Sequence, residues 1–417
     1  MLASKAAGGE SGIRTRGPRF RRHIISNDAH SATLPSLRSP HVPDWIPETT
    51  LRLPEAKSRQ SGTPNPVSRT LATHYNPIRS ERKFSRIGGK LPPIRAVCRQ
   101  QYQSHVTAGP PADRLRFIIA VQTDLRRIWS DLEWLASVPR PAESLRLEEC
   151  RQYCEHELKR AGWLVTRAGF TAENPDLRRR SGVNLVARHA EVLHEPDRPI
   201  FVLGAHLDSC QETPGADDNA SAVAVLLEMA RCLPAEELSA FTSAPELVVF
   251  DLEESGMLGA AHHAGDCRAA GRQLTGMVSL EMLGYCDQLR GSQTLPEELA
   301  GQYPDTGNFI AVVGNQISDD LIGWFAQGCR SVNGLPVEHL RIPDNGHPFP
   351  PTRLSDHSPF WDAGYPALMI TDTSFLRNPH YHEPTDTIDT LDGDFLHKVA
   401  EGVLNGVRMT CQRARKT

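Results

Sequence analysis

The chain has 417 residues, 39% of them hydrophobic, and a formal net charge of −4. This composition can build a substantial core and excludes a wholly disordered chain, while the absence of any run of about 18 apolar residues excludes a transmembrane helix. The nine cysteines form no C-x-x-C pair, so neither a disulfide framework nor a cysteine-based zinc site is expected.

The N-terminal quarter differs from the rest in charge. Residues 1–110 contain 18 Lys and Arg but 6 Asp and Glu, which gives them a net charge of +12 and leaves −16 for the remainder. They also contain 12 prolines and no sustained helical or strand period, as is typical of a segment that cannot bury a core. We predict a basic, proline-rich extension over residues 1–112, disordered or non-native, and a folded domain over residues 113–417.

The extension and the N-terminus also bear on partners and location. The basic residues are not interleaved with aromatic ones and form no known recognition motif, so we expect no nucleic-acid partner. We expect no membrane association either, and because the N-terminus lacks the apolar core of a secretory signal, we expect a cytoplasmic location. The oligomeric state is left open by the sequence.

Helical and strand patterns alternate from residue 113 onward. Helical spacing of apolar residues predicts a helix over residues 113–137 and a second beginning after Ser144, a suitable N-cap. Further helices are predicted over residues 221–233, 257–271, 318–332 and 394–412. Strands are predicted over residues 162–170, 182–190, 199–209, 246–254, 276–285, 308–315, 337–342 and 366–372. This alternation predicts an α/β fold, a three-layer single domain with a mostly parallel central sheet and helices on both faces.

Acidic and imidazole side chains gather where these strands end. His206 and Asp208 follow one apolar run, Glu253 and Glu254 follow the next, and Glu281 ends a third. The stretch GADDNA and the loop that contains His382 add further groups of the same kind. Because ligands bind outside the carboxyl ends of strands in open α/β sheets, we expect these side chains to meet.

So many carboxylates cannot ionise together unless a positive charge lies among them. Imidazole and carboxylate ligands without a thiolate suit zinc and tolerate manganese or cobalt. Two divalent ions about 3.5–4 Å apart, bridged by one carboxylate, form the arrangement that aminopeptidases use. The sequence therefore predicts two zinc ions and a bridging aspartate from GADDNA.

Five motifs in order resemble the di-zinc aminopeptidase family that includes aminopeptidase S and aminopeptidase Y. They are GAHLDS followed by PGADDNASAVAVLLEMAR, then LEESGMLGA, SLEMLGY, SDHSPFWDAGYPALMITDT and NPHYHEPTDTIDTLD, and the resemblance covers roughly residues 115 to 415. It implies a zinc exopeptidase fold, a peptide substrate and the release of N-terminal residues. It also implies that Asp218 bridges two zinc ions, one held with His206 and Glu281 and the other with Glu254 and His382.

The resemblance assigns further roles. Glu253 would be the general base, which takes a proton from the attacking water and passes it to the leaving amine. Asp208 lies two residues beyond His206 on an extended strand, and its carboxylate would accept the other imidazole N–H. Tyr381 would steady the oxyanion by donating a hydrogen bond.

Other functions and other roles stay open. A carboxypeptidase or deacylase shares the ligand order, a glutaminyl cyclase shares the fold but uses one zinc, and a non-catalytic relative would have lost a ligand. Asp217 is the alternative bridging residue or a helix cap, and Asp386 either stabilises its loop or orients His382. His357 either lines a substrate pocket or caps a turn. Two further histidines, His262 and His263, are expected to be surface or core residues rather than metal ligands. Four aromatic residues are expected to pack in the core rather than line a specificity pocket: Trp324, Phe325, Phe360 and Trp361.

Overall fold

The computed structural model describes residues 121–195 and 197–412. The predicted extension over residues 1–112, and its boundary with the domain, lie outside the described residues. The predicted helices and strands occur in the predicted order in the described part, and Ser144 caps its helix by accepting a hydrogen bond from the Leu147 N–H at 3.1 Å. The first helix begins only at Leu125, so residues 121–124 are not helical, contrary to the prediction, and the short helices Ala235–Ala240 and His357–Asp362 were not predicted.

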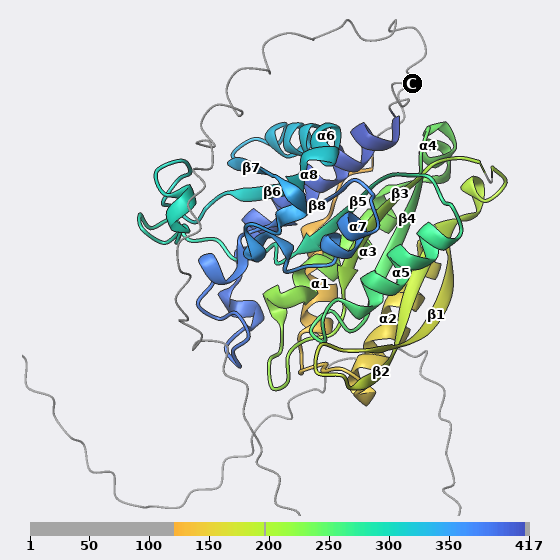
Figure 1. The fold of residues 1–417 in the computed structure, drawn as a ribbon, viewed down its shortest axis with the longest axis horizontal. Coiled ribbons are helices and arrows are strands. Elements are labelled where there is room, and N and C mark those ends of the chain that lie inside the picture. Colours follow the sequence, from red (N-terminus) through yellow and green to blue (C-terminus); the bar gives the residue numbers. More distant parts are fainter. Residues whose placement is uncertain (1–120, 196, 413–417) are drawn as a thin grey trace, which may run out of the picture. The chain divides into compact units, whose positions relative to one another are not determined.

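One mixed sheet of eight strands forms the middle of the described domain (Figure 1). Its spatial order is β1-β2-β4-β3-β5-β8-β6-β7. The strands are β1 Trp163–Glu173, β2 Arg179–His189, β3 Ile200–His206, β4 Ala244–Phe250, β5 Leu274–Glu281, β6 Ile310–Asn315, β7 Val337–Ile342 and β8 Ala367–Thr371. The four central strands, β4, β3, β5 and β8, run parallel, which confirms the mostly parallel centre. Antiparallel pairs flank it, because β2 and β6 run against their inner neighbours.

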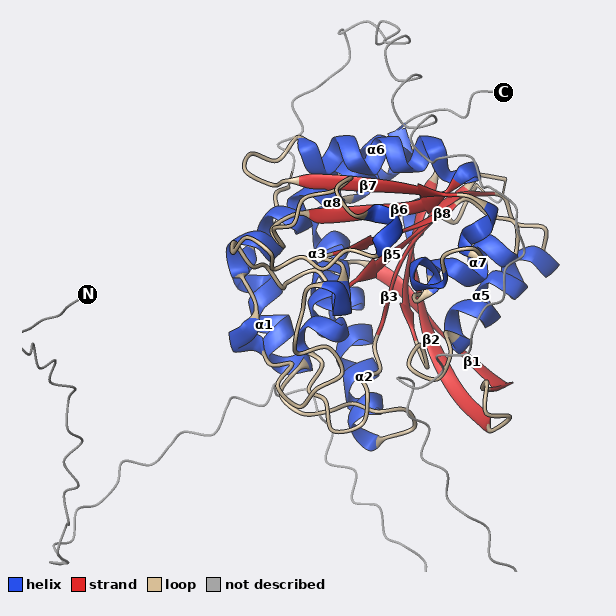
Figure 2. Cartoon of the chain, turned by 60° about the vertical axis from the view of Figure 1, so that its left-hand side comes forward, coloured by secondary structure: helices blue, strands red, loops and turns tan. Residues whose placement is uncertain are grey.

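Helices cover both faces of this sheet, so the fold has three layers, as predicted. The helices are α1 Leu125–Leu135, α2 Leu145–Arg160, α3 Ala222–Cys232, α4 Ala235–Ala240, α5 Leu258–Ala269, α6 Asp319–Arg330, α7 His357–Asp362 and α8 Gly393–Gln412. Figure 2 shows α1, α2 and α3 on one side of the sheet and α5 and α7 on the other. Helices α3 and α6 each pack against α8. No helix in the described ranges has the length and apolar character needed to cross a membrane.

The buried centre explains why the middle strands read as continuous apolar runs. Every residue of β4 is buried, and so is every residue of β3 after Ile200. Strands covered on both faces need no polar alternation, unlike strands with one wet face. Helix α3 is likewise buried along almost its whole length, which holds the segment before it firmly against the sheet.

A charged group inside β4 is the exception to this apolar centre. The buried Glu246 accepts hydrogen bonds from Arg188 on β2 and, at 2.8 Å, from Arg272, and its other oxygen lies 2.9 Å from His263 Nε2 on α5. Burial lowers the pKa of His263, but hydrogen bonds with Cys267 and Glu246 outweigh burial and raise it to about 9. The imidazolium and two guanidinium groups thus compensate a carboxylate that would be costly to bury alone.

This network predicts a pH-dependent stability. The folded pKa of His263 lies above the ordinary value of about 6.5, so its contribution is complete below pH ~6.5 and is lost as the pH rises through about 9. In urea unfolding, the wild-type free energy of unfolding should fall between these pH values by about 3 kcal/mol more than that of His263→Asn. His262→Asn, which changes the half-exposed neighbour, should behave like the wild type. Equal pH profiles for all three proteins would contradict this role of His263.

Candidate metal centre

The carboxyl ends of the central strands bring the predicted acidic and imidazole groups together. His206 is the last residue of β3 and pairs with Phe250, the last residue of β4. Glu281 ends β5 beside Thr371, the last residue of β8. Because parallel strands end at one edge of the sheet, residues far apart in the sequence lie side by side there.

A first group consists of His206, Asp218 and Glu281, which are all buried. The Nε2 atom of His206 lies 3.3 Å from Asp218 Oδ1 and 3.5 Å from Glu281 Oε2. This nitrogen is buried and has no hydrogen-bond partner. Ser355 donates a hydrogen bond to Glu281 Oε2 at 2.7 Å and so fixes that carboxylate. The three side chains leave a nitrogen and two oxygens facing one point.

A second group shares Asp218 with the first. The Nε2 atom of His382 lies 3.2 Å from Asp218 Oδ2 and 3.3 Å from Glu254 Oε2. Cys210 joins this group, because its thiol donates to the same Glu254 oxygen at 3.1 Å. Asp218 therefore presents one carboxylate oxygen to each imidazole, and the side chain of Asp217 does not.

Asp217 instead connects neighbouring loops. Its carboxylate accepts hydrogen bonds from the Gly284 N–H at 2.9 Å and from the Asn378 amide at 2.7 Å. The Asp386 carboxylate accepts hydrogen bonds from the backbone N–H groups of Asp217 and Asp218, at 2.9 and 3.1 Å. Both carboxylates are fully buried, and they fix the backbone from which the Asp218 side chain projects.

The contact of Asp208 differs from the expected one. The Nδ1 atom of His206 lies 3.1 Å from the backbone carbonyl oxygen of Asp208 but 3.7 Å from its carboxylate, which is too far for a hydrogen bond. The carboxylate oxygens accept hydrogen bonds from the backbone N–H groups of Glu253 and Glu254, at 3.0 and 3.2 Å. Asp208 thus fixes the loop after β4, and its main chain, rather than its side chain, meets the imidazole.

Glu253 lies near the first group without belonging to it. Its Oε2 is 4.0 Å from His206 Nε2, and 15% of its side chain is exposed. Burial raises the pKa of this carboxyl, the nearby imidazole of His206 lowers it, and the carboxylates of Glu281 and Glu254 raise it, with the result well above the usual range. A perturbed carboxyl group of this kind beside a cleft is a candidate functional group.

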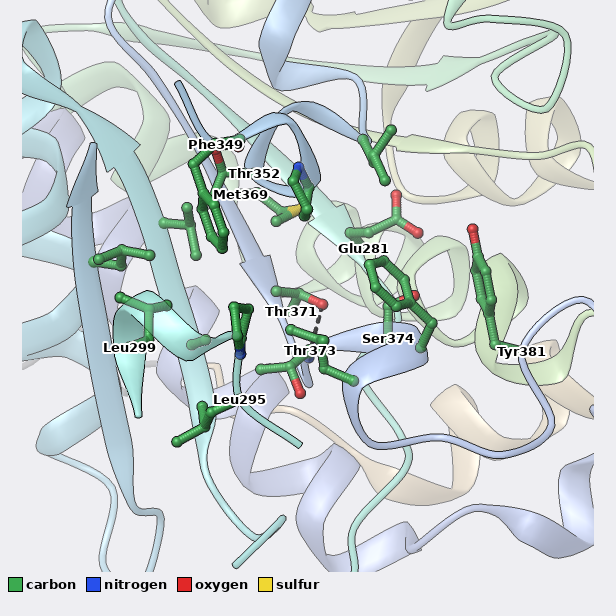
Figure 3. Close-up of a pocket in the computed structure, with 18 of the residues that line it drawn as sticks. Glu281, Leu295, Leu299, Phe349, Thr352, Met369, Thr371, Thr373, Ser374 and Tyr381 are labelled. Carbon is green, nitrogen blue, oxygen red and sulfur yellow. Dashed lines mark hydrogen bonds between the residues drawn. The ribbon is translucent and has the colours of Figure 1, made fainter. Parts of the chain in front are cut away.

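A largely apolar cavity of about 310 Å³ opens beside these groups (Figure 3). Glu281 and Tyr381 lie at one end of the view, and Leu295 and Leu299 lie at the other. The Tyr381 ring stacks on that of His382, with ring centroids 3.7 Å apart. Asp218, Glu253 and Glu254 also line the cavity, and the described residues around it include no lysine or arginine.

The structure places the remaining candidates away from the site. His262 and His263 lie on α5, and His263 belongs to the Glu246 network. His357 is buried, bonds the Thr352 carbonyl at 2.9 Å and packs edge-on against Trp361, so it does not line the cavity. The aromatic residues at 325, 360 and 361 are core residues, and Trp324 does not line the cavity.

Sequence reasoning missed three residues of this region. Ser355 and Asp356 precede His357, which attracted attention in their place. Both carboxylate oxygens of Asp356 are buried without a hydrogen-bond partner, and burial, opposed by His206, raises its pKa to about 8. Cys210 was passed over because it belongs to no paired cysteine motif. The signal that could have found it is its position four residues after His206, in the loop that follows β3.

The sequence match decides the family. Residues 184–407, just over half of the chain, match the model of peptidase family M28. The chain belongs to peptidase family M28. The matched region of this M28 chain includes every residue of the two groups, from His206 to His382.

Individual relatives agree with this M28 assignment. The chain is 38% identical over 222 residues to the uncharacterized protein YfbL of Escherichia coli and 26% identical over 234 residues to a probable leucine aminopeptidase 1 of Trichophyton verrucosum. These matches cover 50% and 53% of the chain and only 66% and 57% of the relatives.

Solved structures share the M28 fold at low sequence identity. An aminopeptidase from Aneurinibacillus sp. strain AM-1 superimposes with a TM-score of 0.55 at 16% identity, covering 72% of this chain and 97% of that one. A glutaminyl cyclase from Porphyromonas gingivalis gives 0.53 at 19%, covering 69% and 99%. This likeness concerns the fold alone.

The two groups fit divalent cations. Imidazole nitrogens and carboxylate oxygens are ligands that zinc accepts, and Asp218 can serve two ions at once. The unpartnered Nε2 of His206 and the buried, unpartnered Oε1 of Glu254 are the atoms that a cation would satisfy. Without a cation, the crowded carboxylates would have to remain partly protonated.

Replacing Asp217 and Asp218 one at a time by asparagine should separate the roles of the two aspartates. Asp218→Asn should weaken binding of zinc at both groups at least roughly ten-fold, because one side chain faces both imidazoles. Asp217→Asn should keep zinc binding and lower the free energy of unfolding by about 1–3 kcal/mol, because it disturbs a buried hydrogen-bonded carboxylate. Zinc titration calorimetry and urea unfolding measure the two effects. Loss of zinc binding in Asp217→Asn alone would reverse the assignment.

Proposed function

We propose that this M28 chain is a metal-dependent aminopeptidase, which releases N-terminal residues from peptides with two zinc ions. The observation that carries the proposal is the cavity in which a cluster of carboxylates meets an apolar pocket without a lysine or arginine among its described lining residues. A substrate α-ammonium is attracted to such a cluster, whereas a C-terminal carboxylate would lack a cationic partner.

The residues supply complementary parts of the reaction. His206, Asp218 and Glu281 would hold one ion, and Asp218, Glu254 and His382 would hold the other. When bound, such a pair supplies Lewis acidity, which polarises a carbonyl group and makes water nucleophilic near neutral pH. Each ligand comes from the end of a different strand or loop, so the sheet itself sets their positions.

Glu253 and Tyr381 would act on protons and charge. The Glu253 carboxylate takes the proton of the attacking water and passes it to the leaving amine. The Tyr381 hydroxyl donates a hydrogen bond to the oxyanion, from a ring held in place by stacking on His382. Asp208 orients Glu253 through the backbone, because its carboxylate accepts a hydrogen bond from the N–H group of that residue.

The pocket beyond the carboxylates indicates the side chain that is removed. Residues such as Leu299, Phe309 and Met369 line it. Leu299 comes from the segment after β5, Phe309 directly precedes β6, and Met369 lies in β8. An apolar wall of this kind favours an apolar N-terminal residue over an anionic one, because an anionic side chain would lose its hydration without a lysine or arginine partner among the described lining residues.

Chromogenic amides test the activity. The purified chain should hydrolyse leucine p-nitroanilide and should stop when a chelator removes the metal and recover with zinc. N-Acetyl-leucine and glutamate p-nitroanilides should react at least ten-fold more slowly, since the first lacks the ammonium group and the second has a charged side chain. Hydrolysis that needs a free C-terminal carboxylate would indicate a carboxypeptidase, and pyroglutamate formed from an N-terminal glutamine would indicate a cyclase. Either result would refute the proposal.

Glu253→Gln should separate proton transfer from metal binding. The substitution keeps the size of the side chain and removes its basicity, so kcat should fall by about 10²–10⁴ while the zinc content stays at the wild-type value. Steady-state kinetics and elemental analysis of the same preparation provide both readings. Retention of wild-type kcat would show that another group accepts the proton.

A further inference from the structure

The thiol of Cys210 lies inside the second ligand group. We propose that Cys210 is a thiolate ligand of the cation held by Asp218, Glu254 and His382. Its Sγ, a carboxylate oxygen of Glu254 and a ring nitrogen of His382 all lie within 4.8 Å of one another. The zinc ligands assigned by resemblance do not include this sulfur.

Unpaired ligand atoms around Cys210 support a cation rather than a simple hydrogen bond. The Glu254 oxygen that accepts from Cys210 also lies 3.3 Å from His382 Nε2, while its other oxygen is buried without a partner. Across the shared Asp218, the His206 side chain is 1% exposed and its Nε2 is unpartnered too. Buried polar atoms left unpaired on both sides of one carboxylate indicate a place for positive charge.

The main chain holds Cys210 in place. Its segment lies between β3 and Asp218, where the fully buried guanidinium of Arg140 donates to the carbonyl groups of Leu207, at 2.6 Å, and Gly215, at 2.8 Å. Ser209 adds a hydrogen bond to the Thr213 carbonyl at 2.9 Å. A loop fixed at both ends presents its thiol in a constant position, as a metal ligand requires.

A sulfur ligand would make the two cation positions unequal. The His206 position offers one nitrogen and carboxylate oxygens, whereas the His382 position adds a soft sulfur and a further negative charge. Soft thiolates select zinc and cadmium over manganese and magnesium. On binding, the thiol proton leaves to solvent as the sulfur–metal bond forms. We therefore expect one position to retain zinc more tightly than the other.

Cobalt provides a direct reading of the sulfur–metal bond. The metal-free full-length chain is titrated with Co²⁺, and the near-ultraviolet charge-transfer absorption of a cobalt–thiolate bond is recorded. The wild type should develop this band with one equivalent per chain. Cys210→Ser, which keeps a donor to Glu254 but not the sulfur, should lack the band and bind zinc at the His382 position at least roughly ten-fold less tightly than the wild type does. Cys286→Ser, the matched change at the other half-exposed cysteine of the described chain, should retain the band.

Thiol labelling gives an independent reading. In a Cys98→Ser, Cys286→Ser background, a maleimide should label Cys210 in the metal-free protein, and bound zinc should slow this labelling. A wild-type cobalt complex without the band, together with unchanged zinc affinity in Cys210→Ser, would overturn the proposal and leave Cys210 as a hydrogen-bond donor.

The proposal rests on the proposed metal-dependent function, and the two can fail separately. If the wild type binds neither cobalt nor zinc, the proposed function fails and this inference fails with it. If two metal ions bind and the amide is hydrolysed but sulfur takes no part, only the role of Cys210 fails.

Discussion

The carboxylate of Asp218, placed between two imidazoles, is the constraint on which the site depends. One oxygen faces His206 and the other faces His382, so the two groups of candidate metal ligands share a single side chain. A carboxylate can face both imidazoles only if its backbone is fixed, and the buried hydrogen bonds from the Asp217 and Asp218 N–H groups to Asp386 provide this restraint. The geometry of the centre thus rests on a second, hidden layer of acidic groups.

The parallel centre of the sheet supplies the other half of this arrangement. Strands β3, β5 and β8 end at one edge, and the loop after β4 adds two glutamates there. Each strand lies deep in the core, so none can shift without disturbing its neighbours. Precision at the site is therefore a consequence of apolar packing elsewhere in the domain.

Much of this could be predicted from the sequence, because strong patterns come from buried strands. The continuous apolar runs predicted β3 and β4, and the acidic residues after them indicated the edge of the sheet. The contacts of Asp208 could not be predicted, since a carboxylate two residues beyond an imidazole can turn toward it or toward a neighbouring loop. Cys210 and Asp356 were missed for a similar reason. Their proximity to the site depends on loop paths, which no periodic pattern records.

The residues that line the cavity likewise divide into those on strands that the sequence pattern predicts and those on loops that it does not. Strands β6 and β8 contribute wall residues that the apolar runs identify, whereas Leu295 and Leu299 come from the irregular segment after β5. A segment without periodicity gives no indication of which of its side chains turn inward. Local sequence therefore predicted the rigid frame of the site better than the selective surface attached to it.

The buried guanidinium of Arg140 shows that residues before the family match are needed to hold the site in place. It holds the loop between His206 and Asp218 through three carbonyl groups, yet it precedes residue 184, where the family match begins. A fragment trimmed to the matched region would contain every candidate ligand but would lose the guanidinium that holds the loop between His206 and Asp218. The described residue Arg140, which lies before β2, is thus part of the frame that holds this loop.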